Sequence, residues 1–581
     1  MTTRSIWPPY VLLLSALAWI FFADVLTLGL DTHDAETFRD HERIAAEWTY
    51  FFSPDKAQAS GRPVAEAVKF LYFLACGNDP TAFHFLSVAF HLLCSLLLAR
   101  LALQCGASPE LSWLGGLLFL VNIAHFQVVH YISALDYALA LSLGLGALSI
   151  FISYLQSRNP LHLGAYYILV LSAVFAHLSM VMLLPFSLCL HWQKEVRIES
   201  MFRRLAPLAL LLSLAFFAQL ALASRETSTW NALEHYPDTS PVILVLGSLR
   251  VFLWLVSRLL TTAYWLPLPV YTMQDWELYL GGLVCVGLAL GVRRKNPWAL
   301  WTLLGLIPFA FLTETTLLDM PVGPSRYLYL ASAGSSVLLA WALLQLSARL
   351  GAAGRYVGAV ALCIVLLFSY QALKRVEGFA YYTSGRHHIA ADHIEKGTEL
   401  LRRAIAQGGD AIPLRDAYLR LCMALLYLDH DSRAMATEAL MPFPDDLMLG
   451  GIAAVLDGED PRTRDRGYQW LQSAQNQATG SGLGDIFKQH LSAVYVNLGK
   501  GYLRREDFTR AIDALQWARK LAPERAQIAT TLSSAYTALA KAQRKRGEVF
   551  EEALKSALEI DAQNTEALRL VEEYIDYGVG S

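Results

Sequence analysis

The sequence has little charge and few cysteines. Charged residues make up 17% of the 581 positions, whereas an ordinary soluble domain has about 25%. The net charge of −3 provides no basic excess for binding nucleic acid. The seven cysteines are scattered, mostly in apolar runs, and no two form a CxxC pair. We therefore expect them to be small core residues, and we exclude a secreted disulfide scaffold.

Motifs of three common enzyme classes are also missing. The chain has no GxxxxGK[ST] loop, no HExxH pair and no GxSxG segment. Their absence argues against a P-loop ATPase, a zinc protease and a serine hydrolase. Any catalytic residues must therefore be sought outside these motifs.

Apolar residues are abundant and unevenly distributed. They make up 55% of the chain, and the mean hydropathy is +0.36. Charged residues form about 12% of residues 1–376 but about 26% of residues 377–581. This contrast predicts an all-α protein with a polytopic membrane domain at 1–375 and a water-soluble domain at 376–581.

Eleven apolar runs are predicted to cross the membrane, because a helix needs about 20 apolar residues to span a bilayer. The first run lacks a small-x-small cleavage site before Asp31, so we interpret it as a span and not as a signal peptide. The predicted spans lie near 9–29, 82–104, 111–130, 134–155, 162–178, 180–193, 206–224, 277–292, 297–313, 326–348 and 356–374.

Lysine and arginine residues in the short loops predict the orientation. With a cytoplasmic N-terminus, the inside loops contain Arg4, Arg100, Arg158, Lys194, Arg197, Arg203, Arg204, Arg293, Arg294, Lys295, Arg349 and Arg355. This assignment requires that the run 242–262, which carries Arg250 and Arg258, does not cross the bilayer, a point that the sequence leaves open. Eleven crossings then place the C-terminal domain in the periplasm, outside a bacterial inner membrane.

The segment 31–80 is predicted to lie on the outer face. It is polar at first and then too short in its apolar part to be a span. Residues 64–74 have the pattern of an amphipathic helix that lies on the membrane surface.

The C-terminal domain contains a tetratricopeptide-like (TPR-like) pattern at 492–525. The matching residues are Tyr495, Leu498, Gly499, Tyr502, Ala511, Leu515, Ala518 and Pro523. A second copy follows at 526–562, and residues 395–440 and 462–478 show helical periodicity. We predict a short α-solenoid of three to four helical hairpins, with a structural or protein-docking role.

Acidic residues and a histidine follow the first span. They are Asp24, Asp31, His33, Asp34, Glu36 and Asp40. A carboxylate just outside the bilayer is suited to take a proton from an attacking hydroxyl. The alternative is an ordinary hydrophilic loop, and we expect Asp24, which is deeper in the span, to pair with a buried partner.

Four arginines, Arg62, Arg250, Arg258 and Arg326, are predicted to lie near the same face. Arginine binds phosphate through two hydrogen bonds and keeps its charge when partly buried, so these residues are candidates for holding a lipid phosphate. The alternative is that each reaches out to the membrane headgroups.

Polar residues also surround the turn between the third and fourth predicted spans. They are His125, Gln127, His130, Tyr131 and Asp136. The histidines are not at metal-ligand spacing, so we predict a polar helix turn here.

Three segments resemble a known family. They are GRPVAEAVKFLYFLACGNDPTAFHFLSVAFHLLCSLLLARLA (61–102), NIAHFQVVHYISALD (122–136) and RYLYLASAG (326–334). Their order and spacing, with the trailing repeats, are similar to those of GT-C class integral-membrane glycosyltransferases. The resemblance is to the repeat-containing O-mannosyltransferases and their bacterial relatives.

The resemblance implies that a sugar is transferred from a polyprenyl-phosphate donor in the membrane to a protein or glycan acceptor on the outer face, by an inverting displacement. Asp34 aligns with the family's catalytic aspartate, and Asp31 is the second choice. The donor phosphate would be bound by Arg326, Arg62 and Arg258. The substrate cavity would include His33, His125, Gln127 and Tyr327.

The chain departs from the family pattern at several positions. His33 replaces one acid of a pair, Gln127 stands where the family has Glu, and Leu135 stands where it has Arg. The family's SKE motif appears as His177-Leu178-Ser179. A changed donor or acceptor is one consequence, and loss of activity is another.

The sequence therefore supports two hypotheses of function. The first is a membrane glycosyltransferase whose repeats dock the acceptor, and the second is a non-catalytic membrane-anchored TPR scaffold for envelope or secretion partners. The sequence does not name the sugar, lipid or acceptor. It also leaves open whether a divalent cation takes part, since a carboxylate cluster can act as a base or hold a cation.

Overall fold

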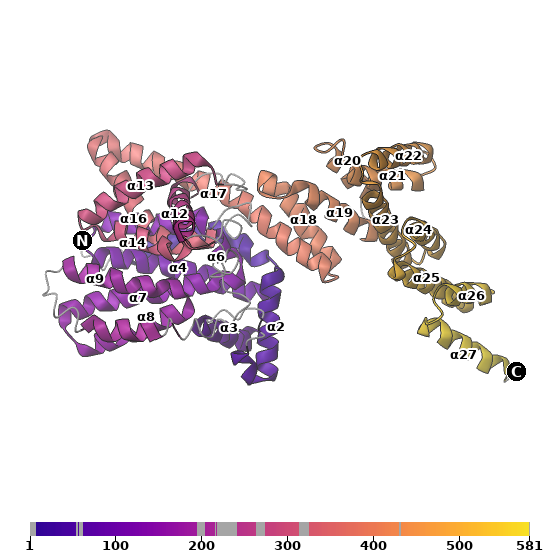
Figure 1. The fold of residues 1–581 in the computed structure, drawn as a ribbon, viewed down its shortest axis with the longest axis horizontal. Coiled ribbons are helices and arrows are strands. Elements are labelled where there is room, and N and C mark those ends of the chain that lie inside the picture. The colour runs from indigo at the N-terminus through magenta and orange to yellow at the C-terminus, as the bar shows by residue number, and fades with distance from the viewer. Residues whose placement is uncertain are drawn as a thin grey trace. The chain divides into compact units, whose positions relative to one another are not determined.

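The chain is all-α, as predicted. The computed structural model in Figure 1 describes residues 7–53, 56, 62–193, 204–214, 217, 241–262, 273–312, 325–428 and 432–579. These residues form α-helices and short 3₁₀ turns, and they contain no strand. The chain divides into a first unit, Met1–His387 with Ala406–Ile412, and a second unit, His388–Ile405 with Pro413–Ser581. The predicted boundary at 375/376 falls inside one continuous helix, α17 (Ala352–Ala390).

The first unit contains most of the long apolar helices. Its elements are α1 (Trp7–Phe22), η2 (Ala23–Thr27), α2 (Thr32–Ala46), η3 (Trp48–Phe52), α3 (Pro63–Cys76), α4 (Pro80–Gln104), α5 (Pro109–Leu120), η4 (Ile123–His125), α6 (Phe126–His130), η5 (Ile132–Ala134), α7 (Leu135–Ser157), α8 (Pro160–Ala176), η6 (Leu178–Met182), α9 (Leu183–Gln193), α12 (Pro241–Thr261), α13 (Asp275–Arg293), α14 (Pro297–Leu306), η8 (Ile307–Phe309), α16 (Ser325–Arg349) and most of α17.

Seven helical segments among the described residues are long and apolar enough to cross a membrane. They are Trp7–Thr27, Pro80–Gln104, Ile132–Ser157, Val242–Thr261, Asp275–Arg293, Ser325–Arg349 and Ala353–Ala390. An eighth candidate is the pair Pro109–Leu120 and Ile123–His130, which is bent by 51°. The remaining predicted spans coincide with shorter apolar helices or, for part of 206–224, lie outside the described residues. The chain therefore has several membrane-type helices, and the total of eleven spans stays a prediction.

α12 has the length and composition of a further candidate span. Its segment Val242–Thr261 is long and apolar enough to cross a membrane, although the predicted orientation required that it should not. The charge of Arg258 in this helix is paired. It forms a buried ion pair with Glu277 of α13, with 2.6 Å between Nη2 and Oε1. Pairing lowers the cost of a charge at membrane depth. The predicted orientation requires that the run 242–262 does not cross the bilayer, and this orientation stays a prediction.

α3 confirms the helix predicted at 64–74 and shows an unusual distribution of side chains. The residues that it buries are Ala65 and Lys69, whereas Leu71 and Leu74 are 64% and 59% exposed. A surface helix facing water would bury its leucines and expose its lysine. The apolar side faces outward, as expected for a helix in contact with lipid.

The second unit is a series of packed helices. They are α18 (Ile394–Gly408), η9 (Gly409–Ala411), α19 (Leu414–Leu428), α20 (Ser432–Leu440), α21 (Leu447–Glu459), α22 (Arg464–Gly480), α23 (Gly484–Arg504), α24 (Phe508–Leu521), α25 (Ala526–Lys545), α26 (Glu551–Ile560) and α27 (Thr565–Val579), of which residues 406–412 belong to the first unit.

Helices adjacent in the sequence pack in pairs in the second unit, as α23 with α24 and α25 with α26 do (Figure 1). Ala511 and Ala518 are fully buried, and a Cβ atom at Gly499 would lie 2.8 Å from Leu515. Small side chains thus allow α23 and α24 to approach closely, at the positions where the repeat pattern requires them. The assignment of these pairs to a TPR solenoid stays a prediction.

Candidate functional site

Asp31 and Asp34 lie at the first turn of α2. Asp31 caps the helix, since its Oδ1 accepts a hydrogen bond from the Asp34 backbone N–H at 2.7 Å. Asp34 Oδ1 accepts a second one from the Ser133 N–H, also at 2.7 Å, in the 3₁₀ turn before α7. The two aspartates are 8% and 1% exposed. This arrangement fixes both carboxyl groups at one buried point, between segments that are about a hundred residues apart.

The surroundings of Asp34 favour a carboxyl group that holds its proton more tightly than usual. Burial raises the pKa of Asp34, and the Asp31 carboxylate raises it further, although the Ser133 N–H opposes the shift. Burial also raises the pKa of Asp31. Asp34 Oδ2 is buried and has no hydrogen-bond partner within the described part of the chain. A buried oxygen of this kind is available to accept a proton from a bound hydroxyl.

His33 does not share this buried position. Its side chain is 69% exposed and lies 3.5 Å from Glu36, between Nδ1 and Oε2. Position 33 therefore faces away from Asp34 on the same helix, because the two residues are adjacent in a helix of 3.6 residues per turn. His33 lies on the exposed side of α2, and its place in a substrate cavity stays a prediction.

The start of α16 is hydrogen-bonded to the turn around α6. The Arg326 backbone N–H donates to Gln127 Oε1 at 3.0 Å, and the Gln127 N–H donates to Ser325 Oγ at 3.0 Å. Ser325 Oγ in turn donates to the Ala124 carbonyl at 2.6 Å. Two of the segments that carry the family resemblance thus meet here. Gln127 uses its side chain to cap α16, which orients Arg326.

Arg326 has no ion pair with any residue that the structure describes. Its guanidinium donates a hydrogen bond to the Tyr327 hydroxyl at 3.1 Å and lies 5.1 Å from the centre of that ring. Tyr327 is itself 7% exposed and packs against Phe309. The positive charge of Arg326 interacts electrostatically with the carboxyl groups of Asp31 and Asp136, so these three residues lie in one neighbourhood. Arg326 is a cation beside the acids that is available to a bound anion.

The other two arginines predicted to bind phosphate are already paired. Arg62 forms an ion pair with the buried carboxylate of Asp136 and lies 5.8 Å from the Tyr137 ring centre. Arg258 pairs with Glu277, as described above. Arg62 belongs to the neighbourhood of Arg326, because the two positive charges repel each other electrostatically. No contact among the described residues joins Arg258 to this group, and Arg250 is exposed on α12.

His125 occupies a packed position between helices. Its Nε2 lies 2.5 Å from Ser332 Oγ, and its ring is 4.4 Å from Phe119 and 4.7 Å from Tyr329, centre to centre. It is 1% exposed. These contacts assign His125 to the interior between α5 and α16, and they give no support to its predicted place in a substrate cavity.

Asp24 has a cationic partner, although not the buried one that the sequence predicts, since the side chains of Asp24 and Lys374 are 49% and 20% exposed. Lys374 of α17 donates hydrogen bonds to Asp24 Oδ2 at 2.6 Å and to Glu377 Oε2 at 2.8 Å. Glu377 Oε1 lies 3.6 Å from His130 Nε2. This chain of charges ties α17 to the end of the first span and to the α6 turn. Sequence reasoning missed Lys374 and Glu377 because they stand at the predicted domain boundary.

Two further polar residues of the neighbourhood were not among the predicted site residues. Lys69 is 4% exposed, and its charge acts on Asp136 and on His41. His177 Nδ1 lies 2.6 Å from Ser179 Oγ, and its ring packs against Tyr137 at 4.1 Å. The signal for Lys69 was present, since it is a lone charge in the apolar run 67–76 of an amphipathic helix.

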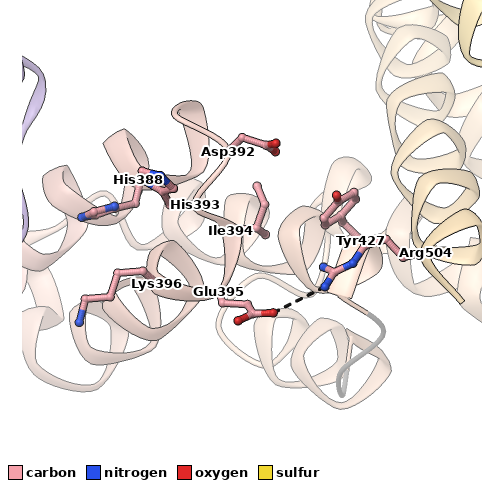
Figure 2. A pocket seen from close by; sticks show the side chains of 8 residues that line it. All are labelled: His388, Asp392, His393, Ile394, Glu395, Lys396, Tyr427 and Arg504. Atoms are coloured by element: carbon pink, nitrogen blue, oxygen red, sulfur yellow. Dashed lines mark ion pairs between the residues drawn. The ribbon is translucent and has the colours of Figure 1, made fainter.

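The second unit has a cavity of about 710 Å³. Figure 2 shows that the end of α17, the start of α18, α19 and α23 contribute to it. Arg504 lies 3.6 Å from Glu395 and 5.0 Å from the centre of the Tyr427 ring. The lining includes the acids Asp392 and Glu395 as well as bases, so the cavity does not select for charge of one sign.

A divalent cation is not favoured by the residues present. Within the described ranges, no group of three His, Cys, Asp or Glu side chains is arranged to hold a metal ion. Asp31 and Asp34 alone supply fewer ligands than a Ca²⁺ or Mg²⁺ site uses.

No protein-family model matches the chain, and a search of the curated proteins finds no match.

Proposed function

We propose that this chain is a membrane glycosyltransferase that uses a polyprenyl-phosphate-linked sugar, with Asp34 as its general base. One observation carries the proposal: a buried carboxyl group with a raised pKa and an unpartnered oxygen lies in the same neighbourhood as Arg326, which has no carboxylate partner among the described residues. A base and a phosphate-binding cation are the two groups that transfer from a lipid phosphate requires. Clusters of perturbed acids and unpaired cations are typical of active sites.

The reaction would proceed by a single displacement. The acceptor hydroxyl oxygen attacks the anomeric carbon of the sugar, its proton passes to Asp34 Oδ2, and the bond between that carbon and the phosphate oxygen breaks. The electron pair of the broken bond stays on the leaving phosphate, next to Arg326. Arg62 is compensated by Asp136, and this ion pair helps to orient the site. Asp31 keeps the proton affinity of Asp34 high.

The proposal extends to the finer features of the chain. Eleven spans in a bacterial inner membrane, with a cytoplasmic N-terminus, would place Asp34 and the second unit on the periplasmic side. The paired helices of the second unit would form a TPR solenoid that docks the protein or glycan acceptor. The cavity beside Tyr427 and Arg504 supports a docking role, because an aromatic ring and a guanidinium suit both sugar and peptide groups.

Replacement of Asp34 by Asn tests the base. The side chain keeps its size and an oxygen for the Ser133 N–H, but it cannot take a proton. We expect transfer to fall roughly 10²–10⁴-fold. The measurement is mass spectrometry of envelope glycoproteins and glycans from cells that express each variant at equal abundance.

Glu36→Gln is the matched control, because Glu36 is on the same helix and its side chain is 30% exposed. It should leave the sugar additions unchanged. A chain that still transfers sugar with both Asp31 and Asp34 replaced by Asn would refute the assignment of the base.

A non-catalytic scaffold is the second candidate. It is favoured by Gln127, which stands where the resembling family has an acid and which caps a helix here. A scaffold predicts that deletion of 388–581 removes function while Asp34→Asn and Arg326→Met do nothing. Complementation of a deletion strain by these three variants distinguishes the two candidates.

A further inference from the structure

His177, which joins α8 to η6, has one ring nitrogen without a partner. The residue is 5% exposed, and its Nε2 is a buried atom that forms no hydrogen bond with any described residue. Its Nδ1 is occupied, because it lies 2.6 Å from Ser179 Oγ and accepts a hydrogen bond from the Ser179 backbone N–H at 3.3 Å. His177 thus uses one nitrogen to cap η6 and leaves the other unused.

The bond to Ser179 determines which nitrogen of His177 carries the hydrogen. A backbone N–H can only donate, so the Nδ1 that accepts from it has no hydrogen of its own. An imidazole with an unprotonated Nδ1 is neutral and carries its hydrogen on Nε2. Nε2–H is therefore a buried donor that lacks an acceptor among the described residues. Such donors are rare in folded proteins, because they lose their hydrogen bonds to water without replacement.

Contacts between rings place His177 beside the segment that holds the proposed base. The imidazole lies 4.1 Å from the Tyr137 ring and 6.1 Å from the Phe309 ring, centre to centre. Tyr137 belongs to α7, which packs along α8 (Figure 1). It follows Ser133 by four residues, and the Ser133 N–H binds Asp34. The unused donor is therefore within the candidate site and not in a remote part of the bundle.

The same rings also connect His177 to the proposed phosphate-binding cation. Phe309 lies 5.3 Å from the ring of Tyr327, whose hydroxyl accepts a hydrogen bond from the Arg326 guanidinium at 3.1 Å. Tyr137, Phe309 and Tyr327 are all buried, and we call them the aromatic cluster. His177 and Arg326 both border this cluster, so it has a neutral N–H donor at one position and a positive charge at another.

This combination suits a sugar that is linked to a phosphate. Ligand sites are mostly apolar and aromatic, with a few polar groups that fix the orientation of the ligand. The guanidinium of Arg326 provides the charge-assisted hydrogen bonds that a phosphate uses. A neutral N–H matches a neutral acceptor, such as the oxygen of a sugar hydroxyl, which can accept this bond while its own hydrogen donates elsewhere.

We propose that His177 is a sugar-binding residue, whose Nε2–H donates a hydrogen bond to a hydroxyl oxygen of the sugar in the lipid-linked donor. The inference rests on the proposed function and names what the site recognises next to the phosphate. A site built to bind a hydroxyl discriminates strongly against a substrate that lacks it, because the buried donor is then left unpaired. His177 thereby helps to determine which sugar is accepted.

The test uses isothermal titration calorimetry on the full-length protein in detergent micelles. The probes are farnesyl phosphate, which has no sugar, and farnesyl phosphate linked to glucose, galactose or mannose, of which the tightest binder is used further. His177→Phe keeps an aromatic ring but lacks the donor. It should weaken binding of the sugar-linked probe about tenfold and change the affinity for farnesyl phosphate little. His177→Gln, whose amide nitrogen is a donor, should retain most of the affinity for the sugar-linked probe.

Deoxy analogues of the sugar-linked probe identify the hydroxyl that is bound. One analogue should bind the wild type about tenfold more weakly and lose nothing further in His177→Phe, which completes a double-mutant cycle. His162→Phe is the matched control, because it makes the same replacement in the first turn of α8, whereas His177 follows the last residue of that helix. It should alter the binding of neither probe.

The possible failures are distinguishable. If His177→Phe binds the sugar-linked probe as the wild type does, weakens both probes equally, or weakens all deoxy analogues as much as the parent sugar, the role of His177 is refuted and the proposed function is unaffected. A wild type that binds the sugar-linked probes no more tightly than farnesyl phosphate also refutes it. If the wild type binds no probe at all, the donor site of the proposed function is itself refuted.

Discussion

The buried ion pair between α12 and α13 provides a test that does not depend on function. Arg258 and Glu277 have side chains that are 6% and 1% exposed, with 2.6 Å between them. Glu277 Oε2 also accepts hydrogen bonds from Trp254 Nε1–H at 2.9 Å and from the Gln274 N–H at 3.1 Å. Removal of one partner of a buried pair typically costs about 3–5 kcal/mol, because the other charge is left without compensation.

The two single replacements should differ in severity. Arg258→Met leaves a carboxylate that keeps two hydrogen-bond donors and can be neutralised by a proton. Glu277→Gln leaves a guanidinium, which does not lose its proton in proteins. We therefore expect Glu277→Gln to lie near the upper end of that range and Arg258→Met near the lower end. The double replacement by methionine should recover most of the loss, since paired charges and well-packed apolar residues are often equivalent when buried.

Thermal unfolding of the purified protein in detergent, followed by tryptophan fluorescence, measures these effects. The wild type, both single variants and the double variant form a complete double-mutant cycle. Equal midpoints for all four proteins would contradict the reasoning, and would mean that α12 is not held to α13 by this pair. A double variant less stable than either single one would also contradict it.

Two other predictions follow from the same geometry. The rate of the proposed sugar transfer should fall when the pH is lowered through a pKa above the usual aspartate value of about 4. The reason is that burial and then the Asp31 carboxylate raise the pKa of Asp34. Asp31→Asn removes the second cause and should move the acidic fall of the pH–rate profile to lower pH. Gly281→Ala should lower the thermal midpoint, since its Cβ would lie 1.9 Å from the Leu253 carbonyl oxygen, whereas Gly282→Ala, with nothing within 4 Å, should not.

The sequence predicted the parts of this fold that depend on local pattern. Long apolar runs and TPR-like spacing are local properties, so the all-α class, the helix at 64–74 and the helices of 492–562 could be predicted from them. A partner for Asp24 was predicted because a charge within a span requires one, although the observed partner is not buried as predicted. The identity of that partner, Lys374, depends on how α17 packs against the first span, and no local pattern contains that information.

The site was predicted only in part for the same reason. Asp34 and Arg326 stand out by their position beside spans, but exposure depends on which side of a helix meets a neighbour. His33 and Asp34 are adjacent in the sequence, yet one is exposed and the other is buried. The pairing of Arg62 with Asp136, 74 residues away, decides that Arg62 is already compensated. Lys69 was overlooked because a single lysine in an amphipathic helix usually faces water.

The contacts between the α6 turn and the start of α16 can form only after both segments have been synthesised. They therefore determine how early this part of the structure can assemble. Gln127 and Ala124 find their partners Arg326 and Ser325 about 200 residues later in the chain. At about 5–20 residues per second, a ribosome needs roughly 10–40 s to make that stretch. During this interval the polar groups of the turn lack their partners while the first spans are already entering the bilayer. A chain that stops before residue 325 lacks these partners, so the Gln127 side chain and the Ala124 carbonyl cannot form the hydrogen bonds that they form in the full-length chain.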